Sequence, residues 1–67
     1  MIIGKRIKEL RQEYGLSLQK LADAIVVDKH AIIYWEQETN EPKASYIVRL
    51  ANFFNVTTDY LLGLTDE

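Results

Sequence analysis

The sequence predicts an all-α fold, a single domain of five short helices. Apolar residues recur three and four positions apart in several segments, and residues that suit helix starts and ends separate those segments. No stretch alternates apolar and polar residues as a half-buried strand does. Because 67 residues is the length of one domain, we expect residues 1–67 to form a single helical unit.

The first two predicted helices are marked by their apolar stripes and by the residues at their ends. In the first, apolar side chains lie four, three and four positions apart, at Ile3, Ile7, Leu10 and Tyr14. Gly15 ends this helix, since glycine readily adopts the left-handed conformation that follows helix ends. Ser17 is a favourable N-cap for the second helix. The apolar stripe of that helix is Leu18, Leu21, Ala22 and Ile25.

The third predicted helix contains the stretch "DKHAIIYWE" at residues 28–36, which holds the only histidine and the only tryptophan. Asp28 caps its start, and we expect it to run to about Glu38, where Thr39 and Asn40 break it. A helix that is apolar nearly all round is normally buried, but its histidine and lysine argue against full burial. We therefore expect one face to hold the fold and the other to meet a partner.

Two further helices complete the predicted fold. Pro42 opens the fourth, at a position where its missing N–H leaves no bond unmade. The buried stripe of this helix is Ile47, Leu50, Ala51 and Phe54. Asn55 suits the left-handed turn that would end it. Thr57 caps a fifth helix, Gly63 ends it, and residues 64–67 form a short tail.

Composition argues against several kinds of function. The chain has no cysteine, so it has neither a disulfide framework nor a thiolate zinc site, and its single histidine predicts no metal and no cofactor. No serine lies beside a usable base and no glycine-rich phosphate loop is present, so we expect neither an enzyme nor a small-molecule ligand. The apolar runs are far shorter than the roughly 20 residues that span a bilayer. No signal-peptide pattern opens the chain, and a cytoplasmic protein with no membrane partner is expected.

The charges are distributed unevenly, although the net charge is only −2. Residues 1–35 carry six basic and four acidic side chains, a balance of +2, whereas residues 36–67 carry two basic and six acidic ones, a balance of −4. This difference fits a domain with one face for polyanions, and it also fits the solvated faces of ordinary helices. The charge pattern alone leaves both interpretations open.

The second and third predicted helices have the proportions of a helix-turn-helix. Three segments carry a more specific similarity: "IGKRIKELRQEYGLSLQKLADAI", "YWEQETNEPK" and "LANFFNVTTDYLLG". Together they resemble the helix-turn-helix domain of the phage repressor and Cro type, the XRE family, from Ile3 to Gly63. The resemblance implies a five-helix lambda-repressor-like DNA-binding domain, with the helix-turn-helix at about residues 17–38. It also implies a sequence-specific regulator of transcription that binds double-stranded DNA, with a repressor as the favoured form.

In the resembled family, the third helix enters the DNA major groove with its N-terminal half. With about 100° per residue and Ile32 set inward, Trp35 and Glu36 also face inward. The side chains expected to face outward are Lys29, His30, Ile33, Tyr34 and Gln37. We expect base contacts from Lys29, His30, Ile33 and Tyr34. We expect phosphate contacts from Ser17, Gln19, Gln37, Thr39, Asn40 and Lys43.

Each outward residue also has a simpler interpretation. Lys29 and His30 fit the exposed surface of any helix. Ile33 and Tyr34 suit thymine methyl groups, and they equally suit an apolar surface for another protein. Two functions of different class are therefore considered: a DNA-binding regulator, and a protein-interaction module on the same fold, such as an antirepressor or an antitoxin.

Three departures from the family pattern bear on the DNA contacts. Val26 stands where the turn between the two helices usually has a glycine, so either the turn is altered or Val26 is strained. Leu18 replaces a glutamine that usually touches a phosphate. The loop after the third helix is often basic, but here it carries Glu38 and Glu41, which repel phosphates. We expect weaker electrostatic attraction to DNA than such domains usually have.

The resemblance also implies an ion pair and a dimer. We expect Arg11 and Glu36 to form a bidentate pair that joins the first and third helices; the alternative is two surface charges that never meet. The family's dimer contact lies near the fifth helix, so a homodimer on a pseudo-palindromic operator is expected. The residues expected in this contact are Phe53, Tyr60 and Leu64. In the alternative, these apolar side chains only complete the core.

Overall fold

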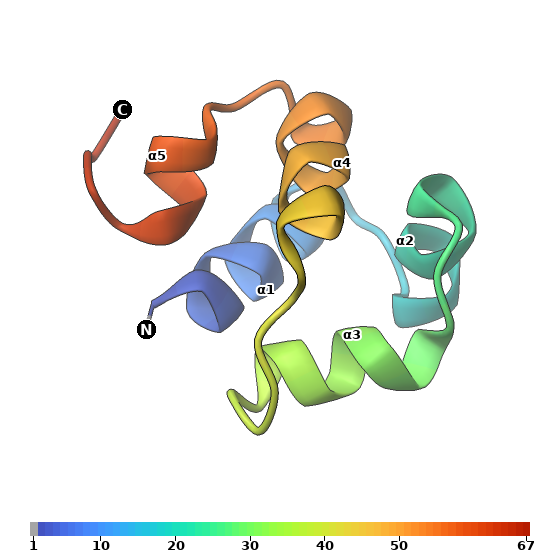
Figure 1. Ribbon diagram of the computed structural model, residues 1–67. Helices are drawn as coiled ribbons and strands as arrows, with labels where there is room; N and C mark the ends of the chain where they lie inside the picture. The colour runs from blue at the N-terminus through green and yellow to red at the C-terminus, as the bar shows by residue number, and fades with distance from the viewer. Residues whose placement is uncertain (1) are drawn as a thin grey trace.

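Five helices make up the part of the chain that the structure describes, residues 2–67 of a computed structural model (Figure 1). They are α1 (Ile3–Glu13), α2 (Leu18–Ile25), α3 (Lys29–Glu36), α4 (Ala44–Phe54) and α5 (Thr58–Leu62). No strand occurs among these residues, and none of the five helices is both long and apolar enough to cross a membrane. The predicted all-α fold and its order of helices are confirmed.

Residues at the expected positions begin α2 and α5 and end α4. Ser17 Oγ accepts a hydrogen bond from the Lys20 backbone N–H at 3.0 Å, and Thr57 Oγ1 accepts one from Tyr60 at 3.0 Å. Each such N-cap contributes about 1 kcal/mol, because it satisfies a backbone donor that the first helical turn leaves without a partner. Asn55 ends α4 in the left-handed conformation, with φ 56°.

The end of α3 differs from the sequence prediction. The helix stops at Glu36, because Glu38 adopts a left-handed conformation with φ 60°. The backbone N–H of Glu38 donates to the Trp35 carbonyl at 3.1 Å, and that of Thr39 donates to the Tyr34 carbonyl at 2.9 Å. These two bonds form a Schellman motif, which satisfies the last carbonyls and turns the chain away from the helix axis.

The start of α4 was also predicted wrongly. The helix begins at Ala44 rather than at Pro42, because Lys43 is extended, with ψ 159°, and serves as the N-cap. The Lys43 carbonyl accepts the first bonds, from the N–H groups of Tyr46 and Ile47 at 3.0 Å. Pro42 therefore lies outside the helix, where its side chain is buried.

The core lies where the helices meet. α1 packs against α3 and α5, while α2 packs against α3 and α4. The buried apolar side chains are Ile3, Ile7, Leu10, Leu21, Ala22, Ile25, Ile32, Trp35, Leu50, Ala51, Phe54 and Leu61. Tyr14, Leu18 and Ile47 were expected in the buried stripes but lie at the rim of the core. Tyr14 stays there because its hydroxyl donates to the Phe54 carbonyl at 2.9 Å.

Gly4 lets α1 and α3 approach each other closely. A Cβ atom at this position would collide with the Trp35 carbonyl oxygen. Glu38 strengthens the same contact, since its Oε1 accepts a bond from the Gly4 N–H at 3.2 Å. A carboxylate is favourable there because the N-terminal end of a helix carries partial positive charge. Figure 1 shows the result: α3 lies along the bottom of the view, with the other helices on one side of it.

Candidate nucleic-acid interface

The turn from α2 to α3 begins with a strained valine. Val26 has φ 59° and ψ 63°, the left-handed conformation, and the residue is 76% exposed. For a residue that carries a Cβ atom, this conformation costs about 1–2 kcal/mol. The sequence left two possibilities for this position, and the structure decides between them. The turn keeps its left-handed bend, and Val26 carries the strain.

Arg49 of α4 supports this turn, a role that the sequence analysis missed. Its Nη1 donates to the carbonyl oxygens of Ile25 and Val26, at 3.2 Å and 3.5 Å. The guanidinium carbon also lies 5.1 Å from the centre of the Tyr46 ring, within the range of a cation–π contact. The one sequence signal was that Arg49 is one of only two basic residues after residue 35.

α3 has a buried side and an exposed side, as expected. Ile32 and Trp35 are buried in the core. The exposed side carries Lys29, His30, Tyr34 and Gln37. Tyr34 is 44% exposed despite its aromatic ring. These side chains from successive turns of α3 therefore form one continuous candidate surface for a partner.

Ile33 departs from the expectation that it faces outward. It is half-buried and lines a shallow hollow with residues of α1 and α2, among them Lys8 and Leu18. The reason is that α1 and α2 pack beside the flank of α3 where Ile33 stands, about 100° round the helix from Ile32, whereas Tyr34 stands about 200° away. Ile33 therefore lies at the edge of the exposed face of α3.

The start of α3 is organised by Asp28. Its Oδ1 accepts a bond from the backbone N–H of His30 at 2.7 Å and lies 2.9 Å from the His30 ring nitrogen Nδ1. The backbone bond and then the side-chain bond lower the pKa of Asp28, because both stabilise the ionised carboxylate. A negative charge is also favourable at a helix N-terminus. The cap therefore fixes the orientation of His30 as well as the start of the helix.

The residues expected to contact phosphates are all exposed, but some of their polar groups already have hydrogen-bond partners within the protein. Thr39, Asn40 and Lys43 lie together in the loop between α3 and α4. The backbone amides of Thr39 and Asn40, however, both donate to the Tyr34 carbonyl, at 2.9 Å and 3.4 Å. The side chains in this loop therefore remain the phosphate candidates, while these two amides are already engaged.

The other phosphate candidates lie at the start of α2 and at the C-terminal end of α3. Ser17 Oγ is engaged as the cap of α2, and Gln19 Nε2 donates to Asp23 at 2.8 Å. Gln37 is exposed at the end of α3. Glu38, expected to repel phosphates, instead directs its carboxylate to the start of α1. Part of its charge is therefore offset by that helix terminus.

Arg11 and Glu36 are brought together by the packing of α1 on α3. Arg11 Nε donates to Glu36 Oε2 at 2.7 Å, and Nη2 donates to Oε1 at 3.0 Å, in the bidentate geometry. A third bond runs from Arg11 Nη1 to the Leu16 carbonyl at 3.0 Å. The hydrogen bond with Glu36 raises the pKa of Arg11, although partial burial acts in the opposite direction. The pair ties α3 to α1 beside the exposed face.

The residues expected in a dimer contact fall into two groups. Phe53 packs on Tyr14, with ring centres 6.2 Å apart, at the C-terminal end of α1. Tyr60 lies under the Arg6 guanidinium, 4.0 Å from ring centre to carbon, in the N-terminal half of α1. Leu64 lies on the side of Tyr60, because its backbone N–H donates to the Asp59 carbonyl of α5 at 2.9 Å, and its side chain is exposed. Arg6 and Tyr14 are eight residues apart along α1, which separates the two groups by about 12 Å.

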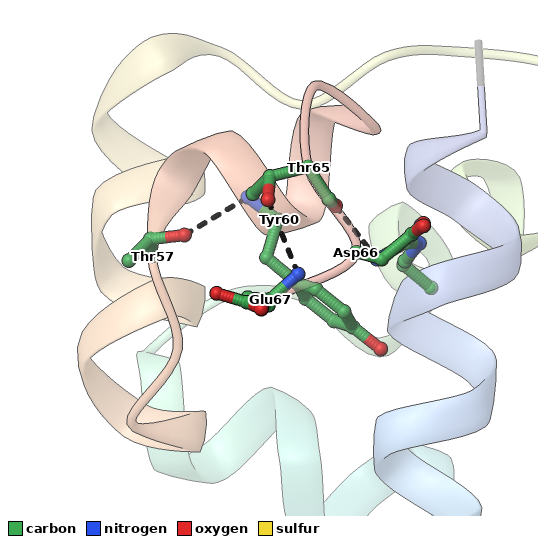
Figure 2. A network of polar contacts seen from close by, with 6 residues as sticks. Thr57, Tyr60, Thr65, Asp66 and Glu67 are labelled. Carbon is green, nitrogen blue, oxygen red and sulfur yellow. Dashed lines mark hydrogen bonds and ion pairs between the residues drawn. The ribbon is translucent and has the colours of Figure 1, made fainter.

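The tail after α5 folds back beside Tyr60, as Figure 2 shows for Thr65, Asp66 and Glu67. Arg6 Nη1 donates to the Thr65 carbonyl at 3.4 Å, and Nη2 lies 3.5 Å from Asp66 Oδ1. Asp66 is fully exposed, so this ion pair contributes little stability. The contacts nevertheless hold the tail against α1.

These features define a helix-turn-helix domain. The family described as "Helix-turn-helix domain" matches residues 4–67, and the chain belongs to this family. Over 63 residues, it is 35% identical to the HTH-type transcriptional regulator ImmR of Bacillus subtilis (strain 168), a match that covers 94% of this chain and 50% of ImmR. The chain thus spans about half the length of the curated relatives it matches.

Solved structures show the same architecture. The P22 c2 repressor in complex with a synthetic operator matches with a TM-score of 0.85 and 26% identity, over 91% of this chain and 92% of that one. SinR of Bacillus subtilis in complex with DNA matches with a TM-score of 0.83 and 31% identity, over 90% and 97%. The lambda-repressor-like fold and the helix-turn-helix resemblance are therefore confirmed.

Proposed function

We propose that this chain is the DNA-binding domain of a transcriptional regulator and inserts α3 into the major groove of double-stranded DNA. The observation that carries the proposal is the exposed side of α3, where Lys29, His30 and Tyr34 project while the opposite side is fixed to α1 and α2. The shared fold with the P22 c2 repressor and SinR, both solved with DNA, supports it. A repressor is the favoured form. We also propose a cytoplasmic location and no catalytic role.

The side chains of α3 suit different features of the major groove. Lys29 can donate to guanine O6 and N7, and the Tyr34 ring can pack against a thymine methyl group. We assign base contacts to these two residues and to His30, with Ile33 at the edge of the contact. We assign phosphate contacts to the exposed side chains of Gln37, Asn40, Thr39 and Lys43. Such contacts position the protein on DNA without reading its sequence.

We further propose a homodimer on a pseudo-palindromic operator. The contact is centred on Tyr60 and Leu64, because Ile2 packs on Gly63 at the same end of α1 and extends the apolar surface. Phe53 already packs on Tyr14 and Phe54 within the monomer. Leu64→Ser should therefore weaken association in sedimentation equilibrium, while Phe53→Ser should weaken it less. Wild-type protein that stays monomeric at high concentration, both free and on DNA, would contradict the dimer.

The DNA-binding proposal is tested by selecting from random duplexes at about 0.1 M salt. The wild type should enrich a pseudo-palindrome whose half-sites lie about one helical turn, roughly 34 Å, apart. Tyr34→Ala should change the base preferred at one position of each half-site. Lys43→Ala should weaken binding to all sequences alike and lower the salt slope by about 0.9. Lys5→Ala removes the same charge from the side of α1 that faces the tail and should change the slope less.

The second candidate function is a protein-interaction module, such as an antirepressor or an antitoxin. It is favoured by two observations: the net charge of −2, and the exposed apolar area of Val26 and Tyr34 near α3. If no motif is enriched by the wild type, the regulator proposal fails. The interaction module then takes its place, with Tyr34→Ala expected to weaken capture of a protein partner.

A further inference from the structure

His30 and Asp28 form a surface pair at the N-terminal end of α3, the end that the proposed function places in the major groove. Asp28 Oδ1 accepts the backbone N–H of His30 at 2.7 Å and lies 2.9 Å from its ring nitrogen Nδ1. The side chains of Asp28 and His30 are 74% and 68% exposed. Because Nδ1 is engaged with Asp28, the ring nitrogen that remains for a partner is Nε2.

The contact with Asp28 decides which ring nitrogen carries the hydrogen. An ionised carboxylate accepts hydrogen bonds but donates none, so Nδ1 must be the donor. The bonds from His30 lower the pKa of Asp28, which keeps the carboxylate ionised near neutral pH. In a neutral imidazole one nitrogen donates and the other accepts. Nε2 of neutral His30 is therefore an acceptor, and protonation of the ring converts it to a donor.

The other charged or titratable groups around the pair lie on three helices. They are Lys29 on α3, Asp23 on α2, and Tyr46 and Arg49 on α4. Asp23 and Tyr46 line the same shallow hollow as Asp28. Among residues 2–67, the His30 ring has its one hydrogen bond with Asp28. Asp28 therefore sets the tautomer of the ring by itself.

We propose that Asp28 is a positioning residue that keeps the hydrogen of the His30 ring on Nδ1, so that the base preferred by His30 depends on whether the His30 ring is protonated. This inference rests on the proposed DNA-binding function. In the major groove, adenine and cytosine present amino donors, whereas guanine presents only acceptors, N7 and O6. Neutral His30, with Nε2 as acceptor, matches adenine or cytosine. Protonated His30 matches guanine, or thymine, which presents the acceptor O4. Because histidine changes charge between about pH 5 and 8, the preferred base at one position of each half-site changes with pH.

The tautomer can be measured without DNA, because His30 is the only histidine in the chain. Long-range ¹H–¹⁵N spectra of the free protein at about pH 8 should show that the hydrogen of the neutral ring is on Nδ1. In Asp28→Ser the cap of α3 is kept, since serine is a good N-cap, but the charged acceptor is lost. This variant should shift the hydrogen toward Nε2. A wild-type spectrum with the hydrogen mainly on Nε2 would overturn the inference.

The base preference is measured by selection from random duplexes at about pH 8 and about pH 5.5. For the wild type, one position should change from adenine or cytosine to guanine or thymine, with relative affinities changing about tenfold. His30→Ala should lose preference at that position at both pH values. Asp28→Ser should weaken the preference at about pH 8 while circular dichroism shows the fold intact. The matched control Asp23→Ser removes a nearby carboxylate that does not contact His30, and it should keep the wild-type response.

The outcomes separate this inference from the proposed function. A wild-type motif that is the same at both pH values and survives Asp28→Ser overturns the role of Asp28 while leaving DNA binding established. The role of Asp28 is also overturned if Asp23→Ser weakens the base preference as much as Asp28→Ser does. A general loss of negative charge would then be the cause. If no motif is enriched at either pH, the DNA-binding proposal itself fails, and the inference fails with it.

Discussion

Replacing Glu36 with alanine tests how α3 is fixed to α1. The carboxylate of Glu36 accepts two bonds from Arg11, at 2.7 Å and 3.0 Å, and the side chains of Arg11 and Glu36 are only 14% and 8% exposed. In Glu36→Ala, Arg11 keeps its bond to the Leu16 carbonyl but loses its counter-charge. A cation would thus remain largely enclosed and only partly satisfied.

The expected loss of stability follows from this geometry. Removing one partner of a buried pair costs about 3–5 kcal/mol, and we expect about 3 kcal/mol because Arg11 retains one hydrogen bond and some contact with water. A domain of this length has a total unfolding free energy of about 3–10 kcal/mol. Since each kcal/mol shifts the Tm of such a domain by about 4–8 °C, the Tm of Glu36→Ala should fall by about 12–24 °C.

Thermal and urea unfolding, followed by far-UV circular dichroism, measures this loss in a double-mutant cycle. The cycle compares Glu36→Ala, Arg11→Met and the double variant, which should lose less stability than the sum of the single variants, by about 2 kcal/mol. Glu13→Ala, an exposed glutamate on α1, serves as the control and should change stability by less than about 0.5 kcal/mol. Strictly additive losses would refute the coupling between α1 and α3 through this pair.

Three further changes follow from the backbone and the caps. Val26→Gly should raise the unfolding free energy by about 1 kcal/mol in urea titrations, because glycine adopts φ 59° without strain; a lower urea midpoint would contradict a strained turn. Gly4→Ala should lower it by about 1–3 kcal/mol, since the new Cβ collides with the Trp35 carbonyl oxygen, and an unchanged midpoint would show that α1 and α3 separate easily. Asp28→Ala should be less stable than the wild type at pH values above the ordinary aspartate pKa of about 3.9. Hydrogen bonds from His30 lower the pKa of Asp28 in the folded state, so this difference in Tm should disappear as pH falls through that lower value; a difference that persists there would contradict the role of the ionised carboxylate.

Much of the fold could be predicted from the sequence because the signals act over a few residues. Ser17 and Thr57 cap helices by bonding backbone groups three positions away, and Asn55 ends a helix through its own backbone conformation. With Ile32 set inward, the angle of about 100° per residue also placed Trp35 on the buried side of α3, as the structure has it. The resemblance to known repressor domains added the order and role of the helices, and the candidate residues Lys29, His30 and Tyr34.

The sequence was least informative where a residue's role depends on distant neighbours. Glu38 was expected only to repel phosphates, yet its carboxylate accepts a hydrogen bond from the N–H of Gly4, 34 positions earlier. Arg49 attracted no interpretation, although it bonds the carbonyl of Ile25, 24 positions away. Ile33 was expected to face outward, but the packing of α1 and α2 beside it leaves it half-buried.

The sequence by itself determined where α2, α3 and α5 start, where α1, α4 and α5 end, and most of the apolar stripes that form the core. Only the tertiary structure decided that Val26 keeps a left-handed turn, because that conformation is held by Arg49 from another helix. The physical reason is the range of the interactions. Caps and apolar stripes join residues within one or two helical turns, whereas the contacts that orient α3 join segments whose proximity exists only after the chain has folded.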